Sequence, residues 1–105
     1  MIAHYKPLKK FFMCKLKKAL AKADFESISM LFFTANDVEA LIDDAEIAIE
    51  DDQNLIDATE PRNELLKKRI ARAQKRIEEN RTIINNGQML LEMIEKNELL
   101  FALDE

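Results

Sequence analysis

The sequence predicts an all-α protein, a small elongated bundle of three to four helices organised around a long C-terminal helix. One observation is an apolar heptad pattern through the last third of the chain, which is typical of a helix that packs along another helix. A second is the presence of only one glycine and two prolines among 105 residues, which leaves few turns for a sheet of short strands. The third is an abundance of Leu, Ile, Ala, Glu and Lys, which favour helix. We therefore expect a single helical domain over residues 1–105, with helices at about 7–23, 25–33, 37–57 and 61–103.

The first predicted helix is amphipathic and basic, with Pro7 suited to its first turn. Its lysines surround an apolar stripe that holds Leu8, Phe11, Phe12, Leu16, Ala19, Leu20 and Ala23. Such a helix can dock on an anionic membrane, lie beside phosphates or fill an acidic groove. It can also simply join the core with its lysines in water, and the acid elsewhere in the chain favours that interpretation. The absence of Trp and of a lipidation signal disfavours the membrane.

The next segment, 25–33, is the most apolar cluster of the sequence and would suit a helix or a strand. Helix is favoured because the chain offers no second strand. The cluster is predicted to fill the core, and the alternative is an exposed Phe-Met anchor for a partner.

Two cap signals frame the acidic helix and the long helix that follows it. Asn36 is the predicted N-cap of helix 37–57, with Glu39 closing a capping box. Thr59 is the predicted cap of helix 61–103, with Pro61 in its first turn. The last helix would run about 65 Å at ~1.5 Å per residue, too long for the preceding sixty residues to cover. We expect its surface to be partly packed by this chain and partly open to a partner.

The heptad pattern of the last helix passes through Gly87. Apolar side chains fill eight of its eleven positions, which are Leu66, Ile70, Ala73, Ile77, Asn80, Ile84, Gly87, Leu91, Ile94, Glu98 and Phe101. Asn85-Asn86-Gly87 is either a C-cap that reverses the chain or part of an unbroken helix. The preserved phase favours an unbroken helix, with any bend placed there.

Charges are segregated along the chain. Residues 1–23 hold seven lysines and no acid, 24–60 hold twelve acids and no lysine or arginine, and 61–105 hold nine bases against eight acids. Such blocks are either interaction surfaces or two halves of an internal match.

An antiparallel helical hairpin would bring these blocks together. It would lay Asp43, Glu46 and Glu50 beside Arg69, Arg72 and Arg76, and the 25–33 cluster level with the residues after Gly87. The first helix would fall near the acidic C-terminal tail. A parallel homodimer along the last helix is disfavoured, because Arg76 of one chain would face Arg81 of the other. An antiparallel homodimer through the apolar C-terminal part escapes that objection.

No catalytic, metal or cofactor motif is present. One histidine, His4, and one cysteine, Cys14, cannot form a zinc site without carboxylates, and the acidic run lacks the glycine of a calcium loop. We expect a non-enzymatic protein without a cofactor. The single cysteine and the lack of a long apolar run indicate a soluble cytoplasmic protein.

Two functions are compatible with this pattern. The first is a small protein-binding module, an adaptor or inhibitor that acts on a larger protein assembly through the long helix and its apolar end. Its acidic helix could imitate the phosphates of nucleic acid, as in small inhibitors from mobile elements. The second is a nucleic-acid-binding regulator that uses the N-terminal lysines or the basic run from Lys67 to Arg76. The predicted partner-binding residues are Asp43, Asp44, Glu46, Glu50, Asp51, Lys68, Arg72, Lys75, Leu90, Met93 and Phe101.

Overall fold

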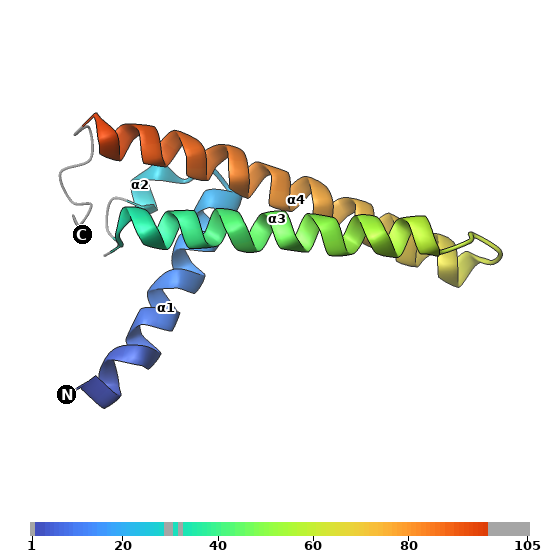
Figure 1. The fold of residues 1–105 in the computed structure, drawn as a ribbon, viewed down its shortest axis with the longest axis horizontal. Coiled ribbons are helices and arrows are strands. Elements are labelled where there is room, and N and C mark those ends of the chain that lie inside the picture. The colour runs from blue at the N-terminus through green and yellow to red at the C-terminus, as the bar shows by residue number, and fades with distance from the viewer. Residues whose placement is uncertain (1, 29–30, 32, 97–105) are drawn as a thin grey trace.

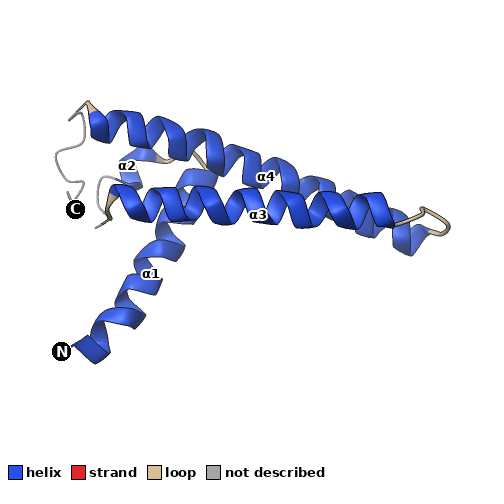
Figure 2. Ribbon diagram, in the orientation of Figure 1, coloured by secondary structure: helices blue, strands red, loops and turns tan. Residues whose placement is uncertain are grey.

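The computed structural model describes residues 2–28, 31 and 33–96, and the side chains of these residues from Lys10 onward. Within these ranges the chain is all-α and elongated, with extents of 52 × 34 × 20 Å, which confirms the predicted class and shape (Figures 1 and 2).

The described residues form four helices. They are α1 (Ile2–Ala21), α2 (Phe25–Ile28), α3 (Ala35–Ala58) and α4 (Glu64–Glu95). α3 and α4 form an antiparallel hairpin, and α2 and the C-terminal part of α1 pack at one end of it (Figure 1). None of the described helices is both long and apolar enough to cross a membrane.

α3 begins slightly earlier than predicted, because a different pair of residues forms its capping box. The Thr34 side chain accepts a hydrogen bond from the Asp37 N–H, and the Asp37 carboxylate accepts one from the Thr34 N–H, at 3.2 and 2.9 Å. The prediction of Asn36 with Glu39 was therefore wrong. Both pairs have the required spacing of three residues, but only the Thr34 pair places its carboxylate against the body of the protein, where Asp37 is 8% exposed.

The connection between α3 and α4 also differs from its prediction. Thr59 is the C-cap of α3, and its hydroxyl donates to the Leu55 carbonyl. Asn63 caps α4 by accepting from the Leu66 N–H at 2.9 Å. Pro61 lies in the loop between them, and α4 starts later than predicted because its N-cap is Asn63 and not Thr59.

α4 continues without a break through Gly87, as the heptad phase predicted. The glycine is needed for close packing, because a Cβ there would lie 2.9 Å from Ile42 Cγ1 and 3.6 Å from Val38 Cγ1. The absence of a side chain at Gly87 therefore lets the backbone of α4 approach α3 closely at this position. α4 ends at Glu95, with Lys96 as its C-cap. The rest of the predicted extension, residues 97–103, lies outside the described residues.

The register of the hairpin differs from the predicted one. Arg76 is bound by Asp52, which lies farther along α3 than the predicted acids Asp43, Glu46 and Glu50. Among the described side chains, Asp43, Glu46 and Glu50 form no ion pair with Arg69 or Arg72. The close fit of Gly87 against Val38 and Ile42 sets the register, because an apolar contact of this kind outweighs exposed ion pairs worth a few tenths of a kcal/mol.

The core lies where α1 and α2 cover the hairpin. Its fully buried side chains are Leu16, Leu20, Ile28, Phe33, Val38 and Leu90. The predicted heptad side of α4 faces inward, with Ile77 buried and Ile70, Ile84 and Leu91 half-buried. In the C-terminal half of α4 burial is nevertheless deeper one residue earlier, at Ile83 and Leu90, because α1 packs against α4 on that side.

The described apolar residues of the 25–33 cluster lie in or against the core, as predicted, and among the described residues of this segment only Phe25–Ile28 are helical. Ile28 and Phe33 are buried, and Phe25 and Leu31 pack against the core together with Leu91 and Ile94. Helix α2 ends at Ile28, so the predicted helix over 25–33 was too long. Residues 29, 30 and 32 lie outside the described residues.

α1 ends in a tight turn at Ala23, which has a positive φ of 54°. The Asp24 N–H donates to the Ala19 carbonyl and the Ala23 N–H to the Leu20 carbonyl, which together form a Schellman motif. The Asn86 amide also donates to the Leu20 carbonyl, at 2.6 Å, and ties this end of α1 to α4.

α1 lies across the hairpin. Its C-terminal half crosses α4 near Arg76 and Ile83, and its N-terminal half extends away from the hairpin (Figure 1). Leu16 and Leu20 enter the core beside Val38. The predicted position of this helix near the acidic C-terminal tail depends mostly on residues 97–105, which lie outside the described residues. The helix starts at Ile2, so Pro7 lies inside it and not at its first turn.

Candidate protein-binding surface

The outer face of α3 carries an exposed isoleucine surrounded by carboxylates. Ile47 is 58% exposed and lies opposite the stripe that packs on α4. Residues three and four apart are neighbours on a helix surface. At Ile47 all four such neighbours are exposed acids, and we call this group the Ile47 patch: Asp43, Asp44, Ile47, Glu50 and Asp51.

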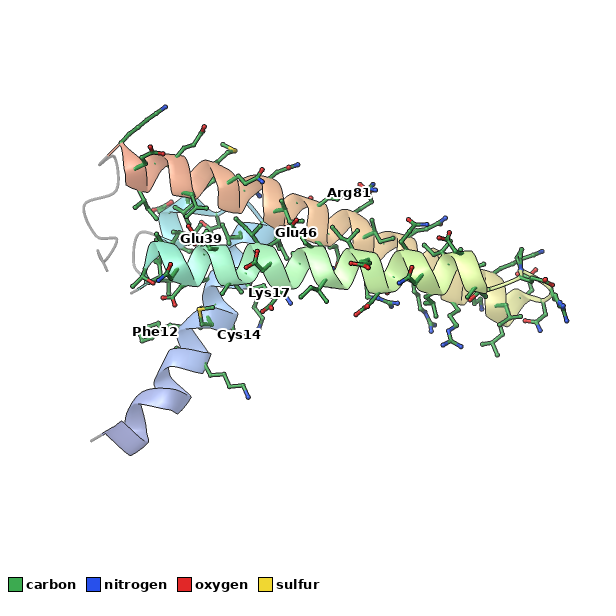
Figure 3. All side chains as sticks on the ribbon, in the orientation of Figure 1. Phe12, Cys14, Lys17, Glu39, Glu46 and Arg81 are labelled. Atoms are coloured by element: carbon green, nitrogen blue, oxygen red, sulfur yellow. The ribbon has the colours of Figure 1, made fainter. Side chains whose placement is uncertain are left out.

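The acids of this face have no basic partner within the described chain. α3 contains no lysine or arginine, and the ion pair that joins it to another described helix uses the inward-facing Asp52. Neighbouring acids at Glu39, Asp43, Glu46 and Glu50 follow each other at steps of three and four residues, which destabilises a helix by a few tenths of a kcal/mol per pair. A cationic partner would relieve this repulsion. Figure 3 shows Glu39 and Glu46 along this helix.

The density of negative charge on α3 approaches that of a nucleic-acid strand. Seven of its acids are exposed: Glu39, Asp43, Asp44, Glu46, Glu50, Asp51 and Asp57. Over a helix of 24 residues this is one carboxylate per ~5 Å of axis, against ~3.4 Å per phosphate along one strand of DNA. The face can therefore bind a surface that carries regularly spaced lysines and arginines.

The basic part of α1 lies on a different side of the molecule. We call the part of α1 that precedes Leu16 the α1 arm. Phe11 is 53% exposed on this arm, and the Lys15 ammonium lies 5.3 Å from the centre of its ring, a cation–π contact. Lys10 and Cys14 are also exposed. An aromatic side chain thus lies in water among cations, as an isoleucine lies among carboxylates on α3.

A second basic region lies where α1 crosses α4. An open cleft of about 430 Å³ separates the two helices. Its lining includes Lys17 and Lys18 from α1 and Arg76 from α4, with Ile83 at its floor (Lys17 and Cys14 are labelled in Figure 3). Hydrogen bonds from Arg76 Nε and Nη2 to the Asp52 carboxylate, 3.1 and 2.9 Å long, raise the pKa of Arg76. This arginine is therefore held in place by α3.

The structure separates the predicted partner-binding residues into three groups. The acids Asp43, Asp44, Glu46, Glu50 and Asp51 all lie exposed on α3, and Lys68, Arg72 and Lys75 lie exposed on α4. The apolar residues do not form a described surface: Leu90 is fully buried in the core, Met93 is half-buried, and Phe101 lies outside the described residues.

Sequence reasoning missed Ile47 and Phe11 as surface residues. A signal for Ile47 was available, because it falls outside the apolar stripe Val38, Leu41, Ile42, Ala45, Ile49 and Ile56 and has acids on all four sides. Phe11 gave no such signal, since it shares the apolar stripe of its own helix. Only the departure of the α1 arm from the hairpin exposes it.

No group of three or more His, Cys, Asp and Glu side chains is placed to hold a metal ion in the part of the chain that the structure describes. Comparisons with the models of known protein families, with curated proteins and with solved structures find no match to this chain.

Proposed function

We propose that this protein is a small non-enzymatic protein-binding module, an adaptor or inhibitor that attaches to a larger protein assembly. The outer face of α3 is the proposed binding surface, and the partner is a basic protein surface of the kind that otherwise contacts nucleic acid. The observation that carries the proposal is the Ile47 patch, an exposed apolar side chain enclosed by four unpaired carboxylates.

This arrangement matches the anatomy of protein interfaces, in which a small apolar centre supplies affinity and a charged rim supplies specificity and a fast association rate. Docking removes the apolar surface of an isoleucine that is 58% exposed from water, and this burial favours binding. The surrounding carboxylates would exclude acidic partners by like-charge repulsion. They would also attract a basic surface over roughly one Debye length, ~8 Å at physiological salt.

The size of the surface limits its affinity. One face of a helix of 24 residues is ~36 Å long and ~10 Å wide, about half of the ~800 Å² per partner in a standard interface. Binding through α3 alone should therefore be weak, and a stable complex needs a second contact.

The test compares charge-reversal variants as baits in affinity capture from an extract of the source organism. The α3 variant is Asp44→Lys with Asp51→Lys, and the matched control is Glu92→Lys with Glu95→Lys, which makes the same charge change at exposed positions of α4. We expect basic proteins that bind to the wild-type and control baits at low salt to be lost from the α3 variant. Equal recovery on all three baits would contradict the proposal. Far-ultraviolet circular dichroism confirms that both variants stay helical.

Nucleic-acid binding is the second candidate. The cleft between α1 and α4 favours it, because Lys17, Lys18 and Arg76 all line this cleft. The net charge of −4 and the acidic α3 oppose it. Fluorescence anisotropy with labelled duplex DNA over a salt series separates the candidates. Binding that weakens steeply with salt and is lost in Lys17→Glu with Lys18→Glu would favour nucleic acid over a protein partner.

A further inference from the structure

We propose that two copies of this chain associate through the α1 arm of one copy and the Ile47 patch of the other. The inference deepens the proposed function and rests on it, because it uses the same face of α3 and identifies one occupant of that face as a second copy of this chain.

The first argument is that described lysines of α1 and the exposed acids of the Ile47 patch do not pair within one copy. Residues 1–23 carry seven lysines without an acid, and residues 24–60 carry twelve acids without a lysine or arginine. Among the described side chains no ion pair joins α1 to the Ile47 patch. Lys10 and Lys15 are therefore exposed on the α1 arm, and the four carboxylates of the patch are exposed on the outer face of α3.

The second argument is the complementarity of the two surfaces. Phe11 is 53% exposed, with Lys10 beside it in sequence and Lys15 one turn away. Ile47 is 58% exposed, with carboxylates one turn away in both directions. Docking the two brings an aromatic and an aliphatic side chain together inside a ring of opposite charges. Buried aromatic anchors surrounded by polar rims are typical of binding hot spots.

The third argument is reach. The α1 arm extends from the hairpin into solvent (Figure 1), and from Ile2 to Cys14 it measures ~20 Å. The patch from Asp43 to Asp51 measures ~12 Å along its helix, so the arm can cover it. The arm cannot reach the patch of its own copy, because α1 enters the core through Leu16, on the side of α3 opposite Ile47. The contact must therefore form between copies.

A second copy also supplies the area that α3 alone lacks. In a two-fold arrangement each copy offers its arm and receives the other arm, so the same contact forms twice. This doubles the buried surface and pairs lysines of each arm with carboxylates of the other copy's patch. A dimer through the C-terminal part, the alternative predicted from the sequence, would depend on neither charge block.

The test is sedimentation velocity of the full chain over a concentration series, at about 50 mM and about 500 mM salt. We expect a concentration-dependent dimer at low salt and a shift toward monomer at high salt. The arm variant, Lys10→Glu with Lys15→Glu, and the patch variant, Asp44→Lys with Asp51→Lys, should each raise the dissociation constant by at least about tenfold. Glu92→Lys with Glu95→Lys, which makes the same charge change as the patch variant but on α4, is the matched control and should leave the dissociation constant unchanged.

Charge complementation gives the decisive outcome. A chain that carries all four arm and patch substitutions has an acidic arm and a basic patch, and it should dimerise again. Phe11→Ala and Ile47→Ala test the apolar centre and should each weaken the dimer without changing its salt dependence. The proposal is overturned if the wild type stays monomeric at every concentration, or if a dimer forms that neither charge reversal weakens.

Two further measurements distinguish this dimer from the proposed function alone and from membrane binding of the arm. If copies do not associate but the patch variant still loses its captured basic proteins, the further inference fails and the proposed function stands. Co-sedimentation with phosphatidylserine vesicles tests the arm as a membrane anchor. Vesicle binding that needs Lys10 and Lys15, combined with a monomeric protein in solution, would overturn the docking of the arm on a second copy.

Discussion

The two halves of the α3–α4 hairpin follow one heptad pattern but are buried to different depths. In the half nearest α1 and α2, which we call the covered half, Val38, Leu90 and the Gly87 contact are enclosed on both sides. In the open half, nearer the connection between α3 and α4, Ala73 and Ile77 are the buried α4 residues and lie outside the main core cluster.

This difference shows that a heptad pattern predicts orientation but not depth of burial. Two helices alone cover each other on one side only, so Leu66 and Ile70 stay half-buried and Leu65 is 73% exposed. A further element must pack on the hairpin to bury its remaining apolar surface. α1 and α2 form this third layer, and they cover one end of the hairpin only. Most of the stability should therefore come from the covered half.

The largest expected effect compares truncations in the two halves. Leu90→Ala in the covered half removes a fully buried side chain and should lower the free energy of unfolding by about 3 kcal/mol. Ile70→Ala in the open half removes a half-buried one and should cost about 1 kcal/mol. Urea unfolding followed by circular dichroism measures both. Equal losses would show that the two halves are stabilised to the same extent.

The next effect concerns the tight approach in the covered half. Gly87→Ala gains about 1 kcal/mol of helix propensity, but its Cβ would lie 2.9 Å from Ile42 Cγ1, and such overpacking costs about 1–3 kcal/mol. We expect a net loss of about 1 kcal/mol in the same unfolding assay.

A double-mutant cycle isolates that contact. In an Ile42→Ala background the obstructing atoms are gone, so Gly87→Ala should become stabilising. A loss of the same size in both backgrounds would mean that Ile42 does not cause it. Gln88→Ala, at the exposed neighbouring position, should change the stability by no more than about 0.5 kcal/mol.

A smaller, favourable effect is expected at the turn that brings the third layer onto the covered half. Ala23 has a φ of 54°, a left-handed conformation that glycine adopts without the strain of a Cβ. Ala23→Gly should therefore raise the free energy of unfolding by about 0.5–1 kcal/mol. The melting temperature should rise accordingly, whereas Ala21→Gly, inside α1, should lower it. If Ala23→Gly is also destabilising, the Schellman turn does not form in solution.

The smallest effect is a pH dependence at the start of α2. Asp24 accepts hydrogen bonds from the Ser27 hydroxyl and N–H, at 2.7 and 3.1 Å, and these lower the pKa of Asp24 below its ordinary value of 3.8. A carboxylate with a lowered pKa in the folded state stabilises the fold above its ordinary pKa. That contribution is lost as the pH falls through the folded-state pKa.

Carboxyl chemical shifts followed by NMR over a pH series measure this pKa directly. Ser27→Ala should move the pKa of Asp24 toward its ordinary value, because the side-chain hydrogen bond is the largest cause of the shift. Glu26, the adjacent acid on α2, serves as the reference in the same spectra. An Asp24 titration that is identical in Ser27→Ala and the wild type would show that Ser27 does not hold the carboxylate.

Local sequence determined the helices, the hairpin and the continuity of α4. These features follow from short-range physics: apolar spacing selects the packed side of each helix, and the Thr-Glu-Pro segment interrupts it. Gly87 could be placed inside a helix because the heptad phase is the same before and after it. The cap residues were harder to predict, since two candidate capping boxes begin only two residues apart, at Thr34 and Asn36.

The candidate binding surface could be predicted only in part. The acids of α3 were identified from their segregation, because charges without local partners stay at a surface. Leu90 was misjudged as a partner-binding residue, because an excess of apolar residues in a sequence does not show which of them the rest of the chain will cover.

Only the tertiary structure decided the register of the hairpin, the direction of α1 and hence the exposure of Phe11. Each depends on contacts between residues far apart in sequence, such as Gly87 with Ile42 and Asn86 with the Leu20 carbonyl. Patterns of charge and hydropathy repeat along a helix, so several registers satisfy them almost equally well. The shapes of the packed side chains differ from one register to the next, and close packing therefore selects one of them.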